Sequence, residues 1–292
     1  MQRRWDIFCT VIDNFGDIGV CWRLARQLTQ DHHQVVRLWV DDLTSFSCIA
    51  PDVNPEIRQQ VVQGVEICHW QCLFVEVEPA EVVVEAFACE LPDVYVAALL
   101  QRKKQPVWIN LEYLSAEPWV TQCHGLPSPH PRFPLIKTFF FPGFVQGTGG
   151  LLCEKDLMVQ KEAFNTTAEY SFLQHNHLLE RKSGEIRISL FCYDTAPVTK
   201  LIRILSESSK PALLIVPEGS VAGSIASLLK NPSLQTGKLI QHGQLTVQII
   251  PFMEQTDYDR LLWSCDFNFV RGEDSFVRAQ WAGSPFVWNI YP

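Results

Sequence analysis

Strands and helices alternate from residue 184 onward, and this alternation limits the possible folds more than any other feature of the sequence. Short runs rich in β-branched and aromatic residues, typical of buried strands, are separated by segments with helical periodicity. Such alternation predicts a mostly parallel sheet with helices on both faces, which is a doubly wound α/β domain. The strands are predicted at 186–191, 212–216, 246–250, 267–270 and 285–288, and the helices at 198–206, 221–229, 256–264 and 275–281.

A second series of the same kind begins at the N-terminus. The continuous apolar run over 6–12 is typical of a buried strand, and the turn-rich segment over 13–19 follows it. Helical periodicity then predicts a helix over 20–30. Further strands are predicted at 35–40, 82–87 and 107–111, with a proline-led helix at 92–103.

Between the two series, prolines and glycines crowd residues 126–150, which predicts loops and connections there. We therefore expect an N-terminal α/β domain over 1–150 and a C-terminal α/β domain over 184–292. A linker region over 151–183 would join them. The length of 292 residues agrees with about two domains.

Charge and hydropathy exclude several classes of protein. The chain has 32 acidic and 24 basic residues, and its net charge of −8 argues against binding to nucleic acid or to an anionic membrane. A basic protein partner remains compatible with this charge. No apolar run is long enough to span a membrane, and the N-terminal apolar stretch is too short for a secretory signal.

The ten cysteines are scattered along the chain. Only Cys68 and Cys72 lie close together, and His69 is the one obvious third ligand, whereas a structural zinc site needs four. We expect buried free thiols and no metal site. These features favour a cytoplasmic protein.

The loop after the first predicted strand combines two acids with two glycines. Gly16 and Gly19 allow a tight backbone, but Asn14 stands where a dinucleotide-binding fingerprint requires its first glycine, so a nicotinamide site is not expected. Asp13 and Asp17 lie at the start of a predicted helix, whose dipole favours ionised carboxylates. The alternative is that Asp17 simply caps the helix.

Two loops of the C-terminal series could bind a nucleotide. Phe252 could stack on a base whose edge Gln255 would bind, although a hydrophobic staple explains the same pattern. The segment over 271–276 opens a helix whose first amides suit a phosphate, with a capping box as the alternative. The acids of the segment over 257–259 are predicted to lie on the solvent-facing surface of a helix.

Longer segments along the sequence add to these loops. They are 13–20 (DNFGDIGV), 85–92 (EAFACELP), 108–115 (WINLEYLS), 125–129 (GLPSP), 141–144 (FPGF) with 148–151 (TGGL), and 271–276 (RGEDSF). Read together, these segments resemble those of the bacterial EarP-type protein-arginine rhamnosyltransferases, which modify elongation factor P. The resemblance covers essentially the whole chain, and several long matches in order are far more specific than one short motif.

The resemblance implies a GT-B glycosyltransferase, an α/β fold with two Rossmann-like doubly wound domains facing a central cleft. It implies transfer of L-rhamnose from dTDP-β-L-rhamnose to an arginine guanidinium of elongation factor P, which activates that factor for translating polyproline stretches. The transfer would invert the anomeric configuration and need no metal or other cofactor. The family continues beyond the position of Pro292, so the C-terminal domain is expected to be cut short here.

The resemblance also assigns site residues. It places the acceptor protein on the N-terminal domain and the donor on the C-terminal domain. The implied catalytic acids are Asp13, Asp17 and Glu273, and the implied backbone of the first loop is Asn14, Phe15, Gly16 and Gly19. The implied donor pocket consists of Phe191, Tyr193, Phe252, Gln255, Arg271, Glu273, Asp274, Ser275 and Tyr291.

Chemistry suggests roles for the acid pair, with Asp17 as the base and Asp13 orienting the guanidinium, or the reverse. Two other functions remain open at this point. One is a GT-B transferase with a different nucleotide sugar or acceptor. The other is a non-catalytic module that binds a nucleotide or a protein.

Overall fold

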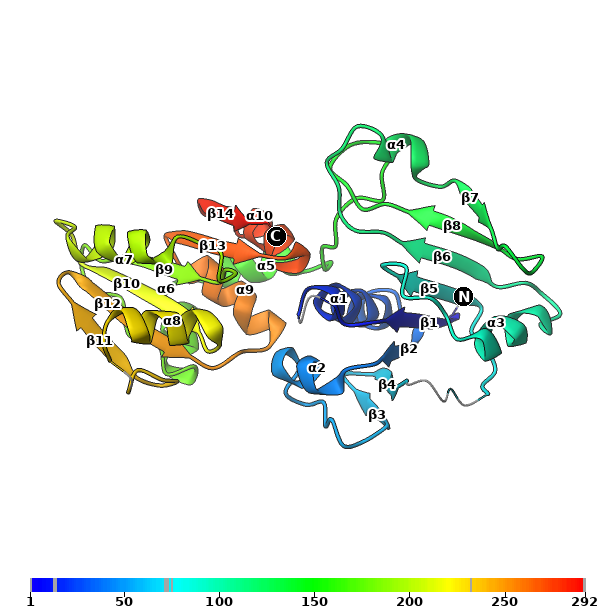
Figure 1. The fold of residues 1–292 in the computed structure, drawn as a ribbon, viewed down its shortest axis with the longest axis horizontal. Coiled ribbons are helices and arrows are strands. Elements are labelled where there is room, and N and C mark those ends of the chain that lie inside the picture. The colour runs from blue at the N-terminus through cyan, green and yellow to red at the C-terminus, as the bar shows by residue number, and fades with distance from the viewer. Residues whose placement is uncertain (1, 13–14, 71–73, 75, 232, 291–292) are drawn as a thin grey trace. The chain divides into compact units, whose positions relative to one another are not determined.

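The computed structural model describes residues 2–12, 15–70, 74, 76–231 and 233–290 (Figure 1). The chain divides into two compact units, Met1–Lys155 and Asp156–Pro292. Each unit contains one sheet flanked by helices, as the alternation of strands and helices predicts.

The sheet of the first unit has, over the described residues, eight strands in the order β3-β4-β2-β1-β5-β6-β8-β7. Its central strands are parallel, and the hairpin-type pairs β3/β4 and β7/β8 at the two edges are antiparallel. The strands are β1 (Arg4–Cys9), β2 (Val35–Val40), β3 (Gln59–Val62), β4 (Val65–His69), β5 (Val82–Ala86), β6 (Val107–Leu111), β7 (Pro127–Pro129) and β8 (Ile136–Phe140). The helices are α1 (Gly16–Gln30), α2 (Leu43–Ile49), α3 (Asp93–Leu100) and α4 (Val120–Cys123).

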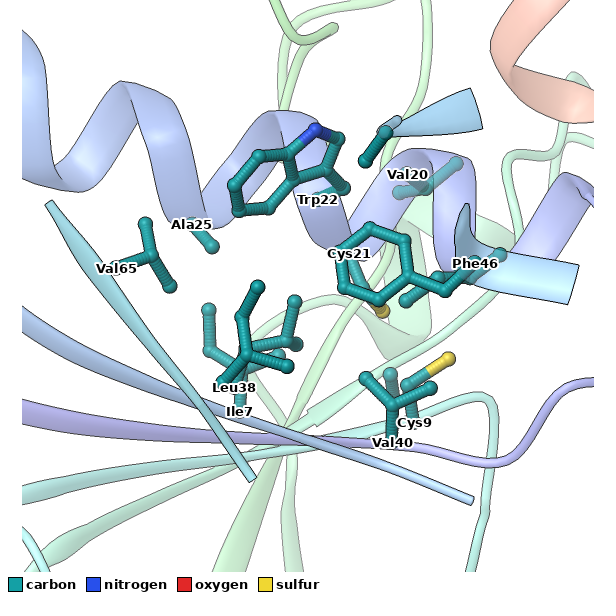
Figure 2. Close-up of a cluster of buried hydrophobic side chains, with 14 of the residues drawn as sticks. Ile7, Cys9, Val20, Cys21, Trp22, Ala25, Leu38, Val40, Phe46 and Val65 are labelled. Carbon is teal, nitrogen blue, oxygen red and sulfur yellow. The ribbon is translucent and has the colours of Figure 1, made fainter. Parts of the chain in front are cut away.

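Helix α1 covers one face of this sheet because its apolar side chains recur at helical spacing. Trp22 and Ala25 of α1 lie over Ile7 of β1 and Leu38 of β2, and Phe46 of α2 packs edge-on against Trp22 (Figure 2). All of these side chains are buried. This packing fixes the position of α1 on the sheet.

The opposite face of the same sheet has a buried carboxylate at its centre. Asp6 accepts hydrogen bonds from the Arg37 guanidinium, the Trp39 indole, the Ala80 amide and the Tyr95 hydroxyl. Burial, followed by the charge and hydrogen bond of Asp6, raises the pKa of Tyr95 far above its ordinary value. The phenol therefore stays protonated and keeps donating to Asp6, which ties α3 to the sheet.

The second unit has, over its described residues, a six-stranded sheet in the order β11-β12-β10-β9-β13-β14, parallel except at the β11 edge. The strands are β9 (Ile186–Leu190), β10 (Ala212–Pro217), β11 (Leu239–His242), β12 (Leu245–Ile250), β13 (Phe267–Arg271) and β14 (Phe286–Asn289). The helices are α5 (Leu157–Ala163), α6 (Thr166–His175), α7 (Val198–Ser206), α8 (Ser220–Leu228), α9 (Gln255–Ser264) and α10 (Glu273–Ala282).

The sequence did not predict α2, α4 or β11, and three further stretches differ from the sequence predictions. The expectation of only loops over 126–150 is wrong, because β8 pairs with β6 and β7 inside this range. The β3/β4 hairpin was not predicted, since its outer strand is short, largely polar and exposed. Residues 157–163 and 166–175, within the predicted linker region, form α5 and α6 of the second unit, where α6 packs against α9.

Candidate functional site

The loop after β1 brings Asp17 to the carboxyl edge of the first sheet. Asp17 lies in the first turn of α1 and is only 2% exposed. One carboxylate oxygen accepts from the backbone N–H of Ile12 at 2.9 Å, and the other accepts from the Tyr113 hydroxyl at 3.0 Å. Phe15 occupies the N-cap position and its side chain makes no capping bond, so the interpretation of Asp17 as a simple helix cap is wrong.

Of the other predicted residues of this loop, the structure describes Phe15, Gly16 and Gly19. Phe15 packs against the core under α1, and the Gly19 amide donates to the Phe15 carbonyl at 2.9 Å. Gly16 is the first residue of α1. Asp13 and Asn14 lie outside the described residues, as does Tyr291 of the predicted donor pocket.

Tyr113 was not predicted as a site residue. It lies two residues after the end of β6, and its hydroxyl reaches Asp17 from a strand that β5 separates from β1. Its ring stacks on that of Phe87, with 4.3 Å between the ring centres and 17° between the planes. The polar run that follows the strand at 107–111 was the available signal, since residues at strand ends carry the chemistry of such sheets.

A second polar cluster occupies β5, β6 and β8. Glu85 is buried, and both of its oxygens accept from the Lys137 ammonium at 3.0 Å, while the Trp108 indole donates to it at 3.0 Å. Asn110, on β6, donates to the Glu112 carboxylate. Burial raises the pKa of Glu112 above its ordinary value, ahead of the opposing effects of Asn110 and Lys137.

The Glu112 pKa predicts a pH dependence of stability. A carboxyl whose folded-state pKa is raised stabilises the fold below its unfolded-state pKa, and loses this contribution as pH rises through the folded-state pKa. Glu112→Gln removes the group, so its melting temperature should rise relative to the original protein between about pH 4 and pH 7. Calorimetry at both pH values measures this difference, and a constant difference would contradict it.

In the second unit, three strand ends bring predicted donor residues together. The Arg271 guanidinium at the end of β13 lies 4.6 Å from the ring centres of both Phe191 and Tyr193, which follow β9. Phe252, after β12, packs edge-on against Phe191 at 6.3 Å. Cation–π contacts of this kind hold a guanidinium in place without using its N–H groups.

The starts of α9 and α10 join this cluster. The Gln255 amide donates to the Asp274 carboxylate at 3.3 Å, and the Ser275 hydroxyl donates to the Arg271 carbonyl. Glu273 lies in the first turn of α10 beside Asp274. Gly272 holds the N-cap position with a φ of 67°, and no side-chain bond caps the helix among the described residues, so the capping-box interpretation is wrong.

The prediction that the acids at 257–259 face solvent is wrong, because α9 packs against both α6 and α10. Asp257 accepts from Asn176 at 3.2 Å and from Arg260 at 2.7 Å. Asp259 accepts two hydrogen bonds from Arg278, at 2.8 and 2.6 Å. These acids connect helices of the second unit.

Further features bear on ligands and location. In the described part of the chain, no three His, Cys, Asp or Glu side chains are placed to hold a metal ion, and the cysteines are free thiols. Cys68 is buried, and Cys72 lies outside the described residues. Among the helices that the described residues form, none is both long and apolar enough to cross a membrane.

Comparison with known sequences yields one consistent family. The family model described as elongation-factor P (EF-P) rhamnosyltransferase EarP matches residues 5–292. Protein-arginine rhamnosyltransferases of Pseudomonas putida, Shewanella oneidensis and Neisseria meningitidis are 50%, 46% and 37% identical to this chain. These alignments cover 100%, 99% and 98% of this chain and 77%, 76% and 73% of the respective relatives.

Comparison with solved structures points to the same family. A structure described as the structural basis for EarP-mediated arginine glycosylation of translation elongation factor EF-P matches with a TM-score of 0.67 and 36% identity. The match covers 99% of this chain and 74% of the chain in that structure. An α-glucosyltransferase in complex with UDP and a 13-mer DNA matches over 99% of this chain and 80% of its own length, with a TM-score of 0.51 and 9% identity. This second match shows the fold alone.

The two doubly wound units and their structural relatives define a GT-B glycosyltransferase, which confirms the expected fold class. The chain belongs to the EarP family of protein-arginine rhamnosyltransferases, as the resemblance implied. Membership of this enzyme family sets aside the alternative of a non-catalytic binding module.

Proposed function

We propose that this chain transfers L-rhamnose from dTDP-β-L-rhamnose to an arginine guanidinium of elongation factor P, with inversion at the anomeric carbon. The observation that carries the proposal is the family match over residues 5–292. Relatives named protein-arginine rhamnosyltransferase support the sugar and the accepting side chain. The solved relative described with EF-P supports the protein acceptor.

The acceptor arginine is a poor nucleophile, which makes the acid in the first loop important. Its guanidinium has a pKa above about 12 and delocalised lone pairs, so a carboxylate cannot deprotonate it in advance. The proton must leave as the new C–N bond forms. In the proposal Asp17 takes this proton late in the step while Asp13 orients the guanidinium, or the two exchange roles.

The donor is assigned to the second unit. The leaving group is a nucleoside diphosphate, and its growing negative charge requires stabilisation. The Arg271 guanidinium, which contacts the rings of Phe191 and Tyr193, would supply a positive charge to this diphosphate. Helix α10 would offer it the first backbone amides. Ser275 contributes through its backbone, because its hydroxyl already donates to the Arg271 carbonyl. This arrangement supports a transfer that needs no metal.

Arg271→Ala should raise the KM for the donor by about 10- to 100-fold, because hydrogen bonds to a charged group contribute about 1.5–3 kcal/mol. The KM for elongation factor P should change little. Initial rates with either substrate varied measure both constants. Arg203 is an exposed arginine on α7, and Arg203→Ala is the matched control. It should leave both KM values unchanged. Equal increases of both KM values would contradict this assignment of Arg271.

The donor and acceptor are tested together by measuring nucleotide release in the presence of EDTA. We expect dTDP release from dTDP-β-L-rhamnose that depends on elongation factor P and is abolished when its acceptor arginine is lysine. Equal or faster release from UDP- or GDP-linked sugars would favour the other GT-B function that the sequence left open. Release that needs an added divalent metal would contradict the metal-independent mechanism.

A further inference from the structure

We propose that Tyr113 is a positioning residue that fixes the orientation of the Asp17 carboxylate, and that Phe87 in turn fixes Tyr113. The inference rests on the proposed function, in which Asp17 takes a proton from the acceptor. It assigns roles to two residues that lie within the matching segments 85–92 and 108–115 but received no role from the sequence.

The two oxygens of Asp17 are held from two separate strand ends. The Ile12 amide, beyond β1, donates to one oxygen at 2.9 Å, and the Tyr113 hydroxyl, beyond β6, donates to the other at 3.0 Å. The backbone of Asp17 belongs to α1. A carboxylate anchored at both oxygens cannot rotate without breaking a hydrogen bond, so removing the Tyr113 donor removes one of these two anchors.

Asp17 and Tyr113 differ in their exposure to solvent. Asp17 is 2% exposed, whereas Tyr113 is 46% exposed. An exposed tyrosine ring samples several rotamers unless something holds it. Phe87 supplies that restraint, because its ring is buried and lies nearly parallel to the Tyr113 ring, with 4.3 Å between the ring centres.

The loop after β5 adopts an unfavourable backbone to place Phe87. Phe87, Ala88 and Glu90 have φ values of 55°, 54° and 51°, in the left-handed region that residues with a Cβ rarely occupy. Such a conformation persists only where surrounding contacts impose it, and it is concentrated at functional sites.

Contacts around this loop impose the conformation. The Phe87 amide donates to the Leu111 carbonyl at 2.7 Å, and the Cys89 amide donates to the Ala86 carbonyl at 3.1 Å. The Cys89 thiol donates to the Phe8 carbonyl at 3.4 Å. The loop is thereby tied to β1, β5 and β6, and it carries Phe87 to the end of β6, two residues before Tyr113.

Tyr113→Phe tests the role of the hydroxyl because it leaves the stacked ring in place. The kcat for transfer should fall by about 10- to 100-fold, the loss expected for a hydrogen bond to a charged group. The donor KM and the melting temperature should not change. Tyr170→Phe, which removes a hydroxyl from an exposed tyrosine on α6, is the matched control and should keep full kcat.

Phe87→Leu tests the second step of the inference. It should lower kcat through Tyr113, so the double variant with Tyr113→Phe should lose no more than Tyr113→Phe alone. Such non-additivity indicates two residues that act through one contact. Additive losses would contradict the role of Phe87.

Three results would overturn the role of Tyr113. The first is a normal kcat in Tyr113→Phe. The second is a loss of kcat that parallels a loss of melting temperature, which indicates a structural role only. The third is a loss as large as that of Asp17→Asn, which would place the Tyr113 hydroxyl in the reaction itself and not in the positioning of Asp17.

A crystal structure of Tyr113→Phe separates this inference from the proposed function. If the original protein transfers no rhamnose, the proposed function fails, but the positioning role still predicts that the Asp17 carboxylate turns away from its original orientation in the variant, because only the Ile12 bond of the two then holds it. An unchanged carboxylate would overturn the positioning role whatever the assay shows.

Discussion

Asp17→Asn is expected to lower the kcat for rhamnose transfer by about 10²- to 10⁴-fold, the range in which a general base contributes. An asparagine has nearly the same shape, but its amide cannot take the proton that the guanidinium must lose. It also turns one acceptor into a donor, opposite either the Ile12 amide or the Tyr113 hydroxyl. Donor KM should change little, because Arg271 and its aromatic clamp lie in the second unit.

Asp41→Asn provides the matched control for this result. Asp41 follows β2 and accepts from the Val11 amide at 2.9 Å, one residue before the amide that binds Asp17. Asp41 is therefore a carboxylate that binds an amide of the same loop as Asp17 and has no assigned part in the reaction. Near-normal turnover of Asp17→Asn, or an equal loss in Asp41→Asn, would contradict the assignment of Asp17.

Arg278→Leu is expected to destabilise the protein by about 3–5 kcal/mol, because it removes the charge and the two hydrogen bonds that Arg278 supplies to the buried Asp259 carboxylate. The Arg278 and Asp259 side chains are 2% and 6% exposed, and they form two hydrogen bonds between α10 and α9. The pair thus fixes the relative position of the two helices whose first turns carry Gln255 and Asp274. Equilibrium unfolding in urea measures the loss.

Two further variants show whether this loss comes from an unpaired charge. Arg278→Leu combined with Asp259→Leu should recover a large part of the stability, since no charge then remains buried. Arg260→Leu breaks the more exposed pair with Asp257 within α9 and should cost less than about 1 kcal/mol. A loss below about 1 kcal/mol in Arg278→Leu would show that the buried pair is not important for stability.

Apart from α5, α6 and β11, the helices and strands of the second unit follow from its sequence to within a few residues. The predicted helix at 198–206 has the bounds of α7, and the predicted strands match β9, β10, β12, β13 and β14 closely. Central parallel strands are apolar on both faces, so each appears as a clear apolar run. Edge strands such as β3 and β7 are short and partly polar, and their pairing depends on distant residues, so local pattern does not reveal them.

The candidate site was predictable only in part. The loop patterns singled out Asp17 and the segment that begins at Arg271, and the family resemblance added Phe191. The structure places Asp17 in the first turn of α1, Phe191 directly after β9 and Arg271 at the end of β13. Tyr113 escaped prediction because its contact joins residues 96 positions apart. The acids of α9 were misassigned because a helix covered by two other helices buries polar positions, which helical periodicity alone does not indicate.

Intact-mass spectrometry of elongation factor P, after incubation with this protein and dTDP-β-L-rhamnose, tests the central claim most directly. The proposed function predicts a gain of one deoxyhexose, which fragmentation places on an arginine and which is lost with Asp17→Asn. An unmodified factor, in a reaction where dTDP-β-L-rhamnose is shown to bind, would contradict the proposed acceptor. A sugar found on any other type of side chain would contradict arginine rhamnosylation by this chain.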